Sequence, residues 1–166
     1  SATSQSGQVS IETASVSGNN VSTGNLSLKT GESTADASGG VSIVSGKADE
    51  AGSIELSVSD SLDSATAGEV RVSAGDSMVG SGGDLLASSG SGQKSGGNIV
   101  LEAGTGMLDN GGSIVLASGA SATSQSGQVS IETASVSGNN VSTGNLSLKT
   151  GESTADASGG VSIVSG

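Results

Sequence analysis

The chain has 166 residues and a formal net charge of −11, with 29 Gly and no Phe, Tyr, Trp, Cys, His or Pro. The negative charge disfavours a nucleic acid as partner, and no apolar run approaches the roughly 20 residues needed for membrane insertion. A composition rich in Gly and Ser is also typical of disordered linkers, so a linker without regular structure is one alternative.

A short module recurs along the chain, and a linker has no need to keep such a pattern in register. Each module starts with a glycine, which we call the opening glycine, and the first apolar residue follows two positions later. A glycine at this place in every module predicts either a positive φ or a backbone too crowded for a Cβ atom. The opening glycines are Gly7, Gly24, Gly39, Gly52, Gly68, Gly83, Gly97 and Gly112.

A second apolar residue follows the first after two positions, so both side chains lie on the same face of an extended strand. Each module then ends on a small residue, which we call the closing residue: Ala14, Gly31, Gly46, Ser59, Gly75, Gly90, Gly104 or Gly119. The second apolar residue after Leu85 is the small Ala87, the one weak member of these pairs. We expect the other fifteen residues to form the core: Val9, Ile11, Leu26, Leu28, Val41, Ile43, Ile54, Leu56, Val70, Val72, Leu85, Ile99, Leu101, Ile114 and Leu116.

The modules belong to a longer repeat, because residues 1–46 reappear unchanged as residues 121–166 at an offset of 120. Residues 1–120 are therefore one full tandem unit of eight modules, and residues 121–166 begin the next identical unit. We expect the sequence to be a window of a longer tandem array.

Short strands recur at a regular spacing, with the same chemistry in each module. This pattern predicts an all-β parallel solenoid built from strand–turn modules, each about 15 residues long when the connection after the closing residue is included. Two modules per rung would place two apolar faces against each other, and this arrangement is favoured by burial. The alternative is one module per coil.

Three apolar residues, Leu86, Val100 and Val115, lie between the inward positions and are expected to face outward. They form a candidate lateral interface between chains, or a surface covered by a return loop, unless they are scattered surface residues. Association at this surface would turn a thread into a fibre.

No catalytic, cofactor-binding or metal site is expected. The acidic residues are spread singly rather than gathered in calcium-binding turns, so at most weak bridging by divalent cations between chains is expected. The N-glycosylation acceptor pattern occurs at Asn20, Asn25, Asn140 and Asn145, and it is meaningful only in a chain secreted by a eukaryote.

The cadence Ser-Gly-Gly-x-Ile-x-Leu-x-Ser-Gly resembles the tandem Gly/Ser-rich β-solenoid segments of very large extracellular proteins, including bacterial solenoid adhesins and diatom adhesive or cell-surface proteins. The resemblance implies an extracellular or cell-surface structural protein that forms a fibre or adhesive thread by stacking of its own units. It implies no enzyme activity, and its main partner would be another copy of the chain. The alternative is a solenoid stalk that binds a glycan, ice or calcium.

Overall fold

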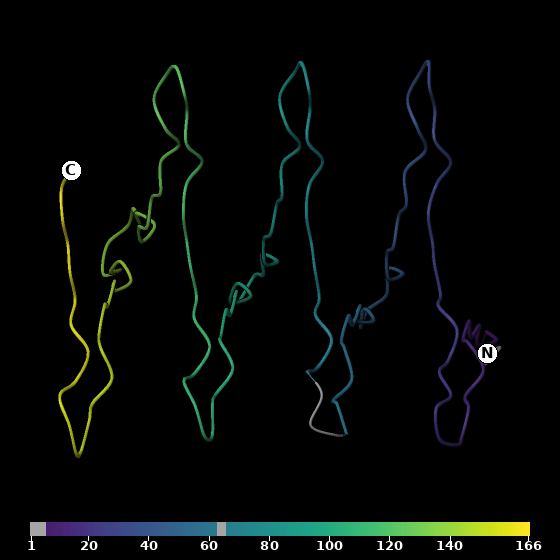
Figure 1. Cartoon of the computed structure of the whole chain (residues 1–166). Coiled ribbons are helices and arrows are strands. Elements are labelled where there is room, and N and C mark those ends of the chain that lie inside the picture. The colour runs from purple at the N-terminus through teal and green to yellow at the C-terminus, as the bar shows by residue number, and fades with distance from the viewer. Residues whose placement is uncertain (1–5, 63–65) are drawn as a thin grey trace. The chain divides into compact units, whose positions relative to one another are not determined.

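The computed structural model describes residues 6–62 and 66–166. Throughout these residues the backbone forms neither helices nor strands, and it consists of extended runs joined by bends (Figure 1). The prediction of an all-β parallel solenoid is therefore wrong, both with two modules per rung and with one module per coil. The alternative of a chain without regular secondary structure agrees with the described residues in this respect.

The backbone hydrogen bonds agree with the absence of a sheet from the described residues. A parallel ladder needs hydrogen bonds between segments that are far apart in the sequence. The backbone–backbone bonds found in the described residues are all local, and each spans only seven or eight positions. They join the amides of Gly83, Gly97, Gly112 and Gly127 to the carbonyls of Gly75, Gly90, Gly104 and Gly119, respectively.

The absence of aromatic residues gives the physical reason. Full burial of one aliphatic side chain contributes about 1.5–3 kcal/mol, whereas fixing the backbone of one residue costs about 1–2 kcal/mol. The stretch of about 15 residues from one opening glycine to the next supplies only two to five large apolar side chains. A single chain therefore gains too little from burial to fix every module in a packed sheet.

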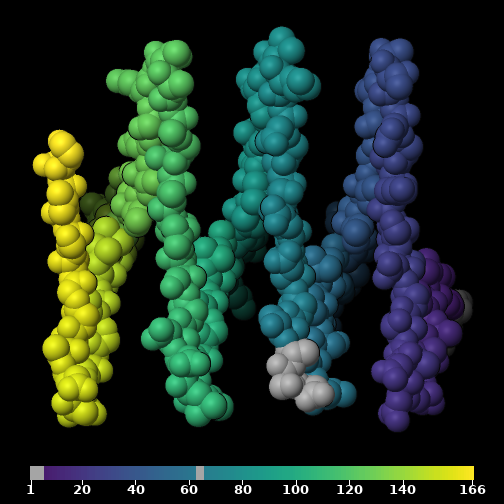
Figure 2. All heavy atoms as spheres, viewed as in Figure 1, coloured from purple at the N-terminus to yellow at the C-terminus, as the bar shows by residue number. Residues whose placement is uncertain are grey.

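The residues expected in the core are open to solvent. In the space-filling view the extended runs are narrow columns of atoms (Figure 2). The fifteen residues expected in the core are between 53% exposed, at Val70, and 85% exposed, at Val9. Within the described part of the chain no side chain is buried, and three are half-buried: Ser45, Ala103 and Thr150. Each of these three residues directly precedes the glycine that closes its module, so shielding is confined to one recurrent position.

The two copies of the repeated sequence adopt the same local backbone. Gly18 and Gly138 have φ values of 141° and 156°, and Asn20 and Asn140 both have a φ of 59°. Since the identical residues bend the chain in the same way, this bend is determined by its own sequence.

Contacts within the chain divide it into two parts, Ser1–Leu85 and Leu86–Gly166. Each part contains the same elements, which are extended runs and closed turns. The unit of 120 residues is a period of the sequence, and it does not coincide with this division. No helix able to cross a membrane is found in 6–62 or 66–166.

Candidate functional site

The best-defined recurrent feature of the chain is the place where a turn closes, which we call the neck. At the neck of turn 104–112 the amide of Gly112 donates a hydrogen bond of 2.8 Å to the carbonyl of Gly104. A Cβ atom at Gly112 would lie 3.3 Å from the Cβ of Ala103, 3.3 Å from the nitrogen of Gly104 and 3.4 Å from its oxygen. The opening glycine thus leaves room for the residue that precedes the closing glycine.

The same geometry recurs at three further necks. The amide-to-carbonyl distance is 2.9 Å in each, and a Cβ atom on the opening glycine would lie 3.3–3.5 Å from the Cβ of Ala74, Ser89 or Ser118. No opening glycine has a positive φ, so at these necks a crowded backbone explains the glycine. The explanation is not general, because no atom lies within 4 Å of a Cβ built at Gly7, Gly24 or Gly52.

The extended run between two necks presents apolar side chains on both faces. In the run 112–119, Ile114 is 54% exposed and Leu116 is 66% exposed, whereas Val115 between them is 82% exposed. The other residues of the predicted lateral interface, Leu86 and Val100, are likewise more exposed than their apolar neighbours. All three are open in the single chain, and their role in lateral association stays a prediction.

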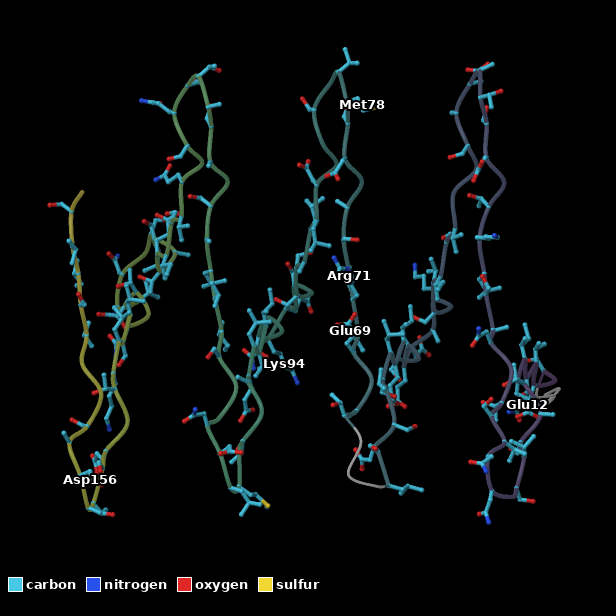
Figure 3. All side chains as sticks on the ribbon, viewed as in Figure 1. Glu12, Glu69, Arg71, Met78, Lys94 and Asp156 are labelled. Carbon is cyan, nitrogen blue, oxygen red and sulfur yellow. The ribbon has the colours of Figure 1, made fainter. Side chains whose placement is uncertain are left out.

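Serine hydroxyls order several turns. The amides of Asp36, Gly80, Ser124 and Asp156 each donate a hydrogen bond of 2.8–3.1 Å to the Oγ atom of the serine three positions earlier. Such local bonds stabilise turns in place of regular secondary structure. The turn closed by Gly75 and Gly83 contains both the Gly80 bond and Met78, whose side chain is fully exposed (Figure 3).

Charged side chains project from the chain singly or in local pairs. Glu69 and Arg71 come from the same extended run, and Lys94 and Asp156 lie in turns (Figure 3). The Nζ atom of Lys149 lies 3.7 Å from Oε1 of Glu152, and both side chains are largely exposed. A search of the described residues finds no group of three or more acidic, His or Cys side chains that could hold a metal ion, and no cavity.

The four predicted glycosylation acceptors lie in two kinds of place. Asn20 and Asn140 occupy a left-handed position in a turn, where asparagine is tolerated better than most residues. Asn25 and Asn145 directly follow an opening glycine. All four are exposed, and their modification stays a prediction.

The comparisons with known proteins give no neighbour: no protein-family model matches the chain, and neither a curated protein nor a solved structure does.

Sequence reasoning missed the residue that precedes the closing residue. The signal was present, because this position holds only short or β-branched side chains: Thr13, Thr30, Ser45, Val58, Ala74, Ser89, Ala103 and Ser118. At the four necks this residue is the one whose Cβ atom would contact a Cβ atom on the opening glycine, as Ala103 would at Gly112. At these necks the small residue and the glycine are therefore two sides of one contact.

Proposed function

We propose that this chain is a non-catalytic structural segment of an extracellular fibre or adhesive thread. Its tandem units provide length, and its exposed apolar runs bind other copies of the same chain. The proposal keeps the self-association expected from the sequence and drops the solenoid as its mechanism.

The observation that supports the proposal is the exposure of large apolar residues in every module, in a chain whose first 46 residues repeat without change. Exposed apolar surface of this extent marks interaction sites in soluble proteins. Because the pairs recur at a nearly constant spacing, a second copy presents the same pairs at the same spacing, which allows many weak contacts to act together. A partner of different sequence would have to reproduce this spacing.

The turns support a mechanical role in the same proposal. Necks and serine-bonded turns divide the chain into short extended runs, and each of these turns is held by one to three hydrogen bonds. Such weak local bonds, each with a net contribution of about 0.5–1.5 kcal/mol, open one by one when a chain is pulled. A thread built in this way lengthens gradually under load.

Binding of a glycan, ice or calcium is not proposed, since no feature of the described residues favours one of these ligands. The test of the proposed function is sedimentation velocity of the 166-residue chain over a wide concentration range, combined with electron microscopy of the sample. We expect reversible oligomers that grow into elongated assemblies as concentration rises. A chain that stays monomeric at the highest soluble concentration would overturn the proposal.

A further inference from the structure

Two of the eight modules in the tandem unit differ from the others in charge. Six modules carry Asp, Glu, Lys or Arg between the opening glycine and the closing residue, whereas modules 39–46 and 112–119 carry none. The chain as a whole has a net charge of −11, so copies of it repel one another over most of their length. The uncharged modules are the places where this repulsion is weakest.

Module 112–119 combines neutrality with two apolar faces. Ile114 and Leu116 lie on one face of the extended run and Val115 on the other, and all three are more than half exposed. The six residues 113–118 contain neither Gly nor Pro, and three of them are large aliphatic residues. Neutral, Pro-free segments of six or seven residues with high β-propensity are typical of strands that pair with their own copies.

The backbone of this module is extended and is held at both ends. A neck fixes each of its ends, through the amide of Gly112 at one end and the carbonyl of Gly119 at the other. Between the two necks, no hydrogen bond within the described part of the chain involves the backbone of residues 113–118. Because the run is already extended, it loses less conformational freedom when it binds than a free segment would.

From these observations we propose that module 112–119 is the contact at which two copies of the chain pair, strand against strand. The occupant is the same module of a second copy. Like-on-like pairing in a charged module, such as 97–104 with its Glu102, places equal charges opposite each other, which is destabilising. In module 112–119 the same pairing brings together only Ser, Ile, Val, Leu and Ala side chains.

This inference rests on the self-association in the proposed function and names the surface that starts it. Its test compares Val115→Glu with Val100→Glu. Val100 is a matched control, because it lies at the centre of an Ile-Val-Leu run held by a neck at each end, in a module that already carries a charge. Both substitutions change the net charge by the same amount, and neither removes a buried side chain.

The measurement is the concentration at which half of the chain is assembled, determined by sedimentation. Val115→Glu is expected to raise it by about tenfold or more, since pairing then places two carboxylates in an apolar contact, while Val100→Glu changes it by less than about twofold. Hydrogen exchange of the assembled wild type is expected to show protection at residues 113–118.

The outcomes separate this inference from the proposed function. Suppose that the wild type assembles, and that Val100→Glu raises the half-assembly concentration as much as Val115→Glu does, or more. The proposed pairing site is then wrong, while the proposed function still stands. Assembly of the wild type without protection from hydrogen exchange at residues 113–118 would likewise reject the pairing site but not the proposed function. If wild type does not assemble at all, the proposed function itself fails.

Discussion

Replacement of Gly112 by Ala tests whether the necks hold the turns. The new Cβ atom would lie 3.3 Å from the Cβ of Ala103 and 3.3 Å from the nitrogen of Gly104, closer than ordinary van der Waals contact. Gly112 or Ala103 must then move by a few tenths of an ångström, and the hydrogen bond of 2.8 Å between Gly112 and Gly104 lengthens.

Gly104→Ala is the matched control, because it changes the other partner of the same hydrogen bond and its Cβ atom meets no atom within 4 Å. Both substitutions reduce the freedom of the open chain by a similar amount, about 0.4–1 kcal/mol, so this contribution cancels in the comparison. The remaining difference is the hydrogen bond, about 0.5–1.5 kcal/mol, which corresponds to about 2- to 12-fold in the closing equilibrium of the neck.

The assay is amide hydrogen exchange at position 112 by NMR, corrected for the intrinsic rate of each residue type. We expect protection at this amide to fall in Gly112→Ala and to be kept or raised in Gly104→Ala. Equal protection in the two variants would show that the space left by the opening glycine is not what holds the neck closed.

Three further predictions concern association and turns. Ile114→Asp should abolish assembly but leave the far-ultraviolet circular dichroism of the dilute chain unchanged; a changed spectrum would reveal a core. Ser153→Ala removes the acceptor of the 3.0 Å bond from the Asp156 amide and should raise the temperature coefficient of that amide, while Thr154→Ala, the control, should not; equal effects would reject the serine-bonded turn. Salt at 0.15 M screens charges beyond about 8 Å and should promote assembly, detected by light scattering; salt-induced dissociation would contradict the role of charge repulsion.

The sequence pattern predicts the positions of the turns better than it predicts how the side chains pack. Opening glycines and closing residues bracket the bends of the chain, as Gly104 and Gly112 bracket the bend at 107–109. Local chemistry is sufficient here, because a small residue, a glycine and a serine hydroxyl act within a few positions of one another. The identical bends at Gly18 and Gly138 show the same local control.

The solenoid prediction failed because alternation of apolar residues identifies a face but not what covers it. Ile114 and Leu116 lie on one side of an extended run whatever lies opposite. A solenoid forms only if another module of the same chain covers this apolar face. Such an arrangement requires more burial than Val, Ile and Leu pairs provide in a chain without aromatic residues.

The candidate interface could be recognised only in part. The alternation of apolar residues predicts that Val115, Leu86 and Val100 all face outward, and it does not distinguish the three. Charge distinguishes them, because the modules of Leu86 and Val100 contain Asp84 and Glu102, respectively. The necks at both ends of module 112–119 were not visible in the sequence, since they depend on which amide reaches which carbonyl.

The described residues of a single chain bury no side chain, so we expect the apolar runs to be covered only when copies associate. Calorimetry over a range of chain concentrations distinguishes this behaviour from the folding of one chain around its own core. We predict no cooperative heat absorption for the dilute monomer, and a transition that appears and moves to higher temperature as concentration rises. A sharp transition in the dilute monomer, at a temperature independent of concentration, would show that one chain buries a core by itself, contrary to this prediction.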